Sequence, residues 1–200
     1  GSQDYDLALR CTEQIDATQI IHIPRVLYHW RMHAGSTAMS SSEKPYAQTA
    51  GQRALNEHLR RTGIAGHAEL LDFGMYRIHY DLPKNEPLVS LIIPTRNAHQ
   101  LVRQCIESIH HKTIYRNYEI ILIDNGSDDK ESVEYFETLS KIDGIRVVRD
   151  DGEFNYSALN NKAVKLANGE FIGLINNDIE VITPEWLSEM VSLAVQPNAG

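Results

Sequence analysis

The sequence predicts an α/β protein with a mainly parallel sheet and helices on both faces, preceded by a smaller, mostly helical segment. Short apolar runs alternate with helical periodicity after residue 87, and polar clusters follow the ends of those runs. A polar stretch with two prolines, residues 81–87, separates this region from the start of the chain. Such alternation is typical of strand-helix-strand units with right-handed crossovers. We therefore expect two parts, residues 1–85 and 86–200.

The first part is predicted to contain two helices. Asp4 and Asp6 stand early in a segment of helical periodicity, where the helix dipole favours acidic side chains. Residues 46–61 repeat small and apolar residues at helical spacing, which is typical of a packing helix. Nine acidic and nine basic residues balance in residues 1–85, so this part carries no formal net charge.

The second part alternates between two kinds of pattern. Apolar runs rich in β-branched residues predict four strands, in residues 88–94, 119–124, 145–149 and 171–176. Apolar residues at helical spacing predict helices between them, in residues 101–109, 133–139 and 159–167. Thr183 and Pro184 predict the start of a further helix, as an N-cap hydroxyl followed by proline. The near-continuous apolar runs indicate strands that are covered on both faces.

Composition narrows the class of protein. The 200 residues include 19 Lys and Arg against 27 Asp and Glu, for a formal net charge of -8. Nucleic acid is bound mainly through clustered Lys and Arg, so a nucleic-acid-binding function is excluded. The chain is 42% hydrophobic and has no apolar run of the ~20 residues that a membrane crossing needs, which predicts a soluble protein. We expect it in the cytoplasm.

The two cysteines, Cys11 and Cys105, lie far apart in apolar, helix-like surroundings. This spacing gives little support to a disulfide framework or a zinc cluster. We expect both to be buried thiols in a reducing compartment.

Each predicted strand of the second part is followed by a polar cluster. The clusters occupy residues 94–97, 124–129, 150–153 and 176–178. Carboxyl ends of parallel strands meet at one edge of the sheet, where open α/β sheets bind ligands. Asn, Asp and Gly are also the usual turn residues, so any single cluster fits a simple turn equally well. Four clusters on one edge favour a binding site.

The last cluster has the composition of a cation site. Asn176 and Asp178 are two residues apart on a segment expected to be extended, so their side chains would point to the same side. Hard divalent cations prefer oxygen ligands and are commonly bound together with substrate phosphates. A strand-to-loop turn is the alternative for these residues. No G-x-G-x-x-G or Walker lysine motif follows a strand, which argues against dinucleotide oxidoreductases and P-loop enzymes.

Four segments in this order resemble the nucleotide-sugar half of family 2 glycosyltransferases. They are residues 89–97 (VSLIIPTRN), residues 118–127 (YEIILIDNGS), residues 154–157 (FNYS) with Asn160 and Asn161, and residues 169–178 (GEFIGLINND). The resemblance covers residues 87–200 and implies the GT-A fold, a Rossmann-like, mainly parallel sheet. It further implies a nucleoside-diphosphate sugar donor and Mn²⁺ or Mg²⁺.

The resemblance also implies which residues bind the donor, with Asp124 against the base. The matched positions are Pro94, Thr95, Asn97, Asp124, Ser127, Asp128, Asn161, Asn176 and Asn177. Asn176 and Asp178 match the ends of the D-x-D motif of the family, and Asp178 would hold the metal. The first Asp of that motif is replaced by Asn176 in this sequence.

Residues 1–10 (GSQDYDLALR) and 23–36 (IPRVLYHWRMHAGS) resemble the carboxyl-terminal half of the same family. Asp4 matches the catalytic base, which in an inverting transfer removes the proton of the acceptor hydroxyl. His33 would help to hold the metal or the diphosphate. Gln3 stands where an acidic residue is commoner.

A carboxyl-terminal half followed by an amino-terminal half indicates a piece of a longer protein with two glycosyltransferase domains in tandem. Tandem enzymes of this kind are associated with bacterial surface polysaccharide and O-antigen assembly. The resemblance therefore implies an inverting, metal-assisted hexosyltransferase that acts on a glycan or lipid-linked glycan. We expect peripheral association with the cytoplasmic face of the membrane and no full turnover by this chain alone.

Three alternatives remain open. Asn176 and Gln3 are amides where carboxylates are common, which favours a degenerate, non-catalytic module that binds a partner or glycan. A nucleotidyltransferase is less favoured, because no basic loop follows the first strand beyond Arg96. The third alternative is that the two parts assemble, in permuted order, into one working site.

Overall fold

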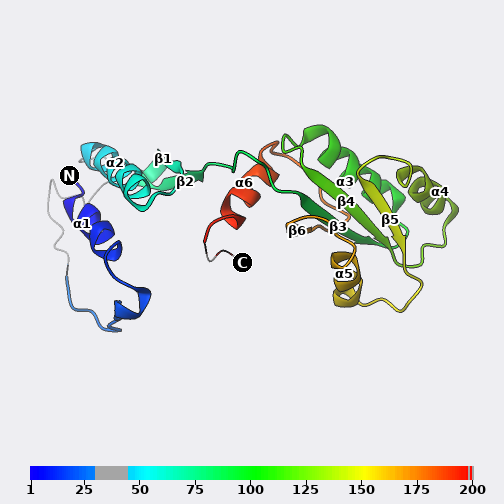
Figure 1. Cartoon of the computed structure of the whole chain (residues 1–200), viewed down its shortest axis with the longest axis horizontal. Helices are drawn as coiled ribbons and strands as arrows, with labels where there is room; N and C mark the ends of the chain where they lie inside the picture. Colours follow the sequence, from blue (N-terminus) through cyan, green and yellow to red (C-terminus); the bar gives the residue numbers. More distant parts are fainter. Residues whose placement is uncertain (30–44, 198, 200) are drawn as a thin grey trace. The chain divides into compact units, whose positions relative to one another are not determined.

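The computed structural model describes residues 1–29, 45–197 and 199 (Figure 1). The chain divides into two compact units, residues 1–81 and residues 82–200, which we describe separately. None of the helices in the described residues has the length and the apolar character that a membrane crossing requires.

The first unit contains the expected helices and an additional β-hairpin. Its elements are helix α1 (Gln3–Thr12), the 3-10 helix η1 (Ala17–Gln19), helix α2 (Pro45–Thr62), strand β1 (Gly66–Leu70), the 3-10 helix η3 (Asp72–Gly74) and strand β2 (Tyr76–Tyr80). The two strands pair antiparallel. The sequence predicted the helical segment, which is confirmed, but not the hairpin.

An ionic cluster joins the end of α1 to α2. Arg61 donates from Nη2 to Oε1 of Glu13 at 2.7 Å and from Nε to Oε2 at 2.8 Å. Nδ1 of His58 lies 2.8 Å from Oε1 of the same carboxylate. The Arg61 hydrogen bond, followed by that of His58, lowers the pKa of Glu13 to about 2. Glu13 is therefore ionised at neutral pH and links both basic side chains of α2.

Side chains of α2 also bind the hairpin. Gln52 donates to the carbonyl of Ala68 at 2.8 Å, and the N–H of Ala68 donates to Asn56 at 2.8 Å. The hydroxyl of Tyr76 donates to the carbonyl of Gln48 at 2.8 Å. These amides occupy backbone groups of β1 that would otherwise form an open edge, and Ala68 is buried against α2.

The second unit is a four-stranded parallel sheet with helices between the strands. Its elements are β3 (Val89–Thr95), α3 (His99–Lys112), β4 (Tyr118–Asp124), α4 (Lys130–Leu139), β5 (Ile145–Arg149), α5 (Tyr156–Val164), β6 (Phe171–Leu174) and α6 (Trp186–Ala194). The strand order is β5-β4-β3-β6, and every neighbouring pair is parallel. The predicted fold class is confirmed.

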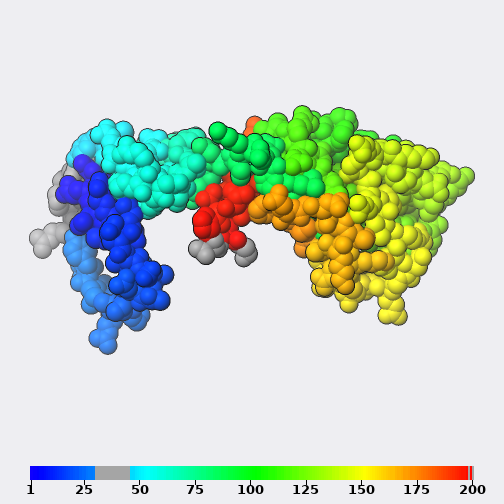
Figure 2. Space-filling model, viewed as in Figure 1, coloured from blue at the N-terminus to red at the C-terminus, as the bar shows by residue number. Residues whose placement is uncertain are grey.

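Successive residues of the central strands pack into cores on opposite faces of the sheet. Leu91 and Ile93 of β3 pack with α3, α4 and α6, whereas Ile92 packs with Leu159 and Ala163 of α5. Figure 1 shows α3 and α4 on one face of the sheet and α5 on the other. In the space-filling view, α3 (green) and the segment after α5 (orange) form opposite sides of this unit (Figure 2). Burial of both faces explains the near-continuous apolar runs of these strands.

Two local expectations differ from the structure. Helix α6 begins at Trp186, preceded by Glu185, and not at the Thr183–Pro184 pair. The carbonyl of Thr183 accepts from the N–H of Trp186, so this pair forms a turn before the helix. Cys11 is exposed and Cys105 is buried, which corrects the expectation of two buried thiols. Cys11 lies in the last turn of α1, a helix with no buried residues, so its thiol is exposed to solvent.

Candidate functional site

A cavity opens where β3 and β6 part at their carboxyl ends. β3 pairs with β4 as far as Thr95 but with β6 only as far as Ile92. Pro94 follows this last pair and has no N–H to donate to a neighbouring strand. The cavity has a volume of about 260 Å³ and is lined by Pro94, Thr95, Arg96, Phe154, Tyr156, Leu159, Asn176 and Asn177.

This cavity coincides with the switch point of the sheet. The chain runs from β3 to β4 and β5 on one side, and β6 returns to the other side of β3. Ligands of open α/β sheets bind outside the carboxyl ends of the strands at such a point. Two of the predicted polar clusters, residues 94–97 and 176–178, contribute residues to the lining.

The carboxylate of Asp124 is buried and held in place at the end of β4. Oδ1 accepts from the backbone N–H of Ser127 at 2.9 Å, and Oδ2 accepts from Nη1 of Arg149 at 2.7 Å. The same Nη1 donates to the carbonyl of Ser127 at 2.7 Å. Arg149 thus binds both the carboxylate and the loop after it, a role that the sequence did not predict. Its place at the end of a strand, beside a polar cluster, is the signal that could have indicated it.

Asn97 joins the loops after β3 and β4. Its backbone N–H donates to Oγ of Ser127 at 2.7 Å, and its side chain exchanges two hydrogen bonds of 2.9 Å with the carboxylate and the N–H of Asp128. The Asn97 hydrogen bond is the main reason that the pKa of Asp128 is lowered. The backbone of Asn97 is left-handed, with φ of 55°, which Asn tolerates better than most residues. Asn97, Ser127 and Asp128 therefore form one connected group.

The segment after β6 differs from the extended geometry that was expected for it. The strand ends at Leu174, and Asn177 and Asp178 lie in a turn. Asn176 and Asn177 line the cavity, and Nδ2 of Asn177 donates to Oγ1 of Thr95 at 2.9 Å. Asp178 is exposed and does not contribute to the lining. The alternation assumed for Asn176 and Asp178 ends at this turn.

The loop after β5 is ordered by charged and amide groups. Lys162 of α5 donates to Asp150 at 2.8 Å, and this hydrogen bond is the first cause of the lowered pKa of Asp150. Asn155 caps α5 by accepting from the N–H of Ala158 at 3.0 Å. Asn161 lies exposed on α5 and outside the cavity lining, so its predicted contact with the donor stays a prediction.

Among the described residues, the predicted catalytic base and the predicted metal ligand do not line the cavity at the sheet edge. Asp4 is exposed in the first turn of α1, where its carboxylate accepts from the N–H of Tyr5 at 3.0 Å. It belongs to the first unit, and its catalytic role stays a prediction. His33 lies outside the described residues. Asp178 is absent from the one cluster of His, Cys, Asp and Glu side chains in the described residues that is close enough to share an ion.

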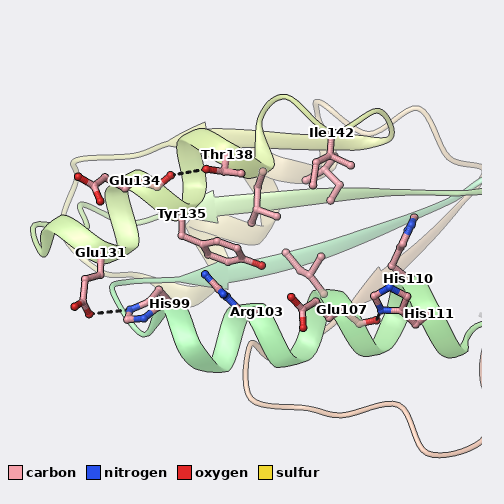
Figure 3. Close-up of a pocket in the computed structure, with 13 residues that line it drawn as sticks. His99, Arg103, Glu107, His110, His111, Glu131, Glu134, Tyr135, Thr138 and Ile142 are labelled. Carbon is pink, nitrogen blue, oxygen red and sulfur yellow. Dashed lines mark hydrogen bonds and ion pairs between the residues drawn. The ribbon is translucent and has the colours of Figure 1, made fainter.

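A second and larger cavity, of about 690 Å³, lies between α3 and α4 (Figure 3). The guanidinium of Arg103 stands over the ring of Tyr135, 4.7 Å from its centre. None of the residues predicted to bind a nucleotide sugar lines this cavity. The smaller cavity at the sheet edge is therefore the candidate donor site.

Comparison with known proteins identifies the family of this chain. The sequence model of Glycosyl transferase family 2 matches residues 90–200. The chain belongs to this family. In the matched region the fold has a four-stranded parallel sheet and the polar strand ends described above.

Two relatives match the whole chain. An uncharacterized protein of Sinorhizobium fredii is 48% identical over 205 residues, covering 100% of this chain and 22% of the relative. The O-antigen biosynthesis protein RfbC of Myxococcus xanthus is 37% identical over 202 residues, covering 100% of this chain and 15% of the relative. The chain thus spans less than a quarter of the length of either relative.

A solved structure shares the fold. The mannosyltransferase PcManGT from Pyrobaculum calidifontis, in complex with GDP-Man and Mn²⁺, aligns with a TM-score of 0.50 and 18% identity. The alignment covers 76% of this chain and 42% of that structure. The second unit therefore has the GT-A fold of glycosyltransferases.

Proposed function

We propose that residues 82–200 form the donor-binding part of an inverting glycosyltransferase. The observation that carries this proposal is the cavity at the switch point, lined by Pro94, Thr95, Asn176 and Asn177. The loops beside it are linked through Asn97, and Asp124 is fixed before any ligand arrives. In this proposal Asp124 contacts the base of the donor. Ser127, Asp128 and Asn161 lie around the nucleotide.

The proposal includes a divalent cation, Mn²⁺ or Mg²⁺, held by Asp178 together with the donor diphosphate. Asn176 supplies an amide oxygen where the D-x-D motif has its first carboxylate. One protein carboxylate suffices when phosphates complete the coordination. The excess negative charge of residues 86–200 would otherwise repel a diphosphate. The Mn²⁺ bound in PcManGT supports this assignment.

The transfer proceeds by attack of an acceptor hydroxyl oxygen on the anomeric carbon of the sugar. A carboxylate base removes the hydroxyl proton as the new bond forms, and the nucleoside diphosphate leaves with its electron pair. In the proposed tandem arrangement, Asp4 is the base of the preceding domain, to which residues 1–85 belong, and His33 assists its metal or diphosphate. In this proposal the described residues of 82–200 do not supply the base for their own transfer, so we expect no full turnover by this chain alone.

The wider role in this proposal is the synthesis of O-antigen or another surface polysaccharide, which the name of the relative RfbC supports. The group transferred in this proposal is a hexose. The acceptor in this proposal is a glycan or a lipid-linked glycan, reached at the cytoplasmic face of the membrane.

Calorimetry tests donor binding directly. UDP and GDP are titrated into the chain with and without Mn²⁺, and we expect at least one to bind in a Mn²⁺-dependent way. Asp178→Ala should weaken this binding tenfold or more. Glu180→Gln is the matched control, because Glu180 is a nearby exposed carboxylate occupied by Lys112 and Gln104. The proposal fails if neither nucleotide binds or if Asp178→Ala leaves binding unchanged.

A second candidate function is a non-catalytic module that binds a partner or glycan. Asn176 and Gln3, amides at positions where carboxylates are common, favour it. Hydrolysis of donor sugars by the full-length parent separates the two. An enzyme should release nucleoside diphosphate well above its Asp178→Ala variant, whereas a binding module should not.

A further inference from the structure

Three potential metal ligands meet where α3 and α4 begin. His99 is the first residue of α3, Asp129 is the N-cap of α4, and Glu131 lies in the first turn of α4. One ligand atom from each lies within 4.8 Å of the others. Figure 3 shows His99 and Glu131 facing one another from the two helices. These residues are separate from Asp178 and from the lining of the donor cavity.

The backbone places both helix starts firmly. Asn97 and Ala98 are left-handed, with φ of 55° and 58°, and α3 begins immediately after them at His99. Oδ1 of Asn97 accepts from the N–H groups of Asp128 at 2.9 Å and Asp129 at 3.3 Å. A single side chain on the β3 loop therefore fixes the start of α4. Ligands held by such contacts need little reorganisation to bind an ion.

One carboxylate oxygen of the cluster has no hydrogen-bond partner in the described residues. Oδ1 of Asp129 accepts from the N–H of Ser132 at 2.8 Å, but Oδ2 is buried without a hydrogen-bond partner. The hydroxyl of Ser132, which is fully buried in the same turn, also has no partner. A buried carboxylate oxygen without a partner is costly. One carboxylate oxygen of Asp129 lies within 4.8 Å of the ligand atoms of His99 and Glu131, and an ion bound to this carboxylate through Oδ2 would remove that cost.

The charges around the cluster favour a cation. Within the parts of the chain that the structure describes, no Lys or Arg forms an ion pair with Asp129 or Glu131. Among the described residues, the ion-pair contact of Glu131 is with Nδ1 of His99, at 3.6 Å, which is too long for a hydrogen bond. That separation is close to the ligand–ligand distance of about 3.4 Å that metal–ligand bonds of 2.0–2.1 Å give in a tetrahedral zinc site.

We propose that His99, Asp129 and Glu131 form a zinc site. An imidazole with two carboxylates suits Zn²⁺ better than Mg²⁺, which prefers oxygen ligands alone. Three protein ligands leave a fourth position for water. The ion would link the starts of α3 and α4 beside the Asn97–Asp128 contact, so it should stabilise this corner of the second unit. The site is independent of the metal proposed at Asp178.

The positions of Asp129 and Glu131 have a second explanation that involves no metal: acidic residues at the start of a helix are stabilised by the helix dipole. Titration of the metal-free chain with ZnCl₂ alone distinguishes the two explanations. We expect the chain to bind Zn²⁺ at this site, and we expect the zinc affinity to fall tenfold or more in His99→Ala and also in Glu131→Gln. His110→Ala and Glu134→Gln are matched controls. Both residues line the cavity between α3 and α4 that His99 and Glu131 also line, but they lie outside the cluster. Both controls should bind as the unchanged chain does.

Nuclear magnetic resonance of the histidine ring nitrogens tests directly whether His99 binds the ion. The ring nitrogen signals of His99 should shift on addition of one equivalent of Zn²⁺, whereas those of His110 should not. Circular dichroism of each variant without metal checks that it folds. The proposal is overturned if zinc affinity is unchanged in both His99→Ala and Glu131→Gln, or if all zinc binding is lost in Asp178→Ala.

Discussion

Asn97 shows how one side chain organises the site. It takes a left-handed backbone conformation at the end of the β3 loop, and it bonds to Ser127, Asp128 and Asp129 of the β4 loop. Few residue types combine this conformation with both donor and acceptor groups. The sequence predicted Asn97 as a donor-binding residue. The structure gives it the further task of joining two loops.

Replacing Asn97 by Ala should therefore destabilise the second unit. The change removes the side-chain hydrogen bonds to Asp128 and Asp129 and places Ala in a left-handed conformation, at an expected cost of about 1–3 kcal/mol. Urea unfolding measures the loss. Asn97→Gly is the control for the backbone, since glycine adopts positive φ without strain. Equal stability of Asn97→Ala and the unchanged chain would contradict this reading.

The two thiols should react very differently. Cys105 is buried, and burial raises the pKa of its thiol to about 11. Cys11 is exposed on α1. A thiol reagent at pH 8 should modify Cys11 rapidly and Cys105 only after unfolding, because the thiolate is the reactive form. Mass spectrometry measures the modification. If the folded Cys11→Ser variant is not modified, Cys11 is the thiol that reacts in the folded chain.

At the scale of elements, one carboxylate makes shorter ionic contacts between α1 and α2 than the Arg10–Glu57 and Asp6–Arg61 pairs do. Glu13 follows α1 and binds Arg61 and His58 of α2, so its charge holds the end of α1. Its pKa is lowered to about 2 from the usual 4.5. A lowered pKa means that the folded state favours the charged form, and its contribution to stability is complete above pH 4.5.

We therefore expect α1 to lose its contacts with α2 as the pH falls from about 4.5 towards 2. The stabilisation disappears when Glu13 is protonated, because neutral Glu13 no longer attracts Arg61. Hydrogen exchange of α1 amides as a function of pH measures this. Glu13→Gln should show fast exchange at every pH. Slow exchange in that variant at pH 7 would show that other contacts hold α1.

Elements were predictable where local pattern and tertiary environment agree. The strands β3 and β4 are mostly buried, β5 is partly buried, and all three are rich in β-branched residues. Their positions match the predicted ones within one residue at every end. The start of α6 was misplaced, because Thr183–Pro184 has the composition of both a helix start and a turn. The hairpin of β1 and β2 carries no clear alternation. Its pairing is supported by Gln52 and Asn56 of α2, which are distant in sequence.

At the scale of the whole molecule, the chain consists of two units that are connected along the sequence by a polar segment, residues 81–87. The boundary of the units falls between Asp81 and Leu82, a few residues before Pro87. Lys84 is exposed, whereas the carbonyl of Pro87 accepts from the buried hydroxyl of Tyr115 and that of Glu86 from Asn117. The second unit is thus anchored just after Lys84.

Limited digestion with trypsin should therefore cut after Lys84 and leave residues 85–200 intact as a compact product. The contacts of Glu86 and Pro87 protect the chain that follows the cut, and its central strands, β3 and β4, are mostly buried. Mass spectrometry identifies the product. Lys84→Ala should abolish this cut. Rapid degradation of residues 85–200 would show that the second unit needs the first for its stability.

The sequence by itself determined the parallel α/β fold, because strands buried on both faces must be apolar and the helices between them must be amphipathic. It also placed Pro94, Thr95 and Asn176 at one sheet edge, since carboxyl ends of parallel strands meet there. Only the tertiary structure decided that Asn177 lines the cavity while Asp178 is exposed outside its lining, and that Arg149 binds Asp124. Such contacts join residues far apart in the chain, and no local pattern encodes the turn that directs a side chain. The meeting of His99 with Asp129 and Glu131 is of the same kind, because it depends on how α3 and α4 pack.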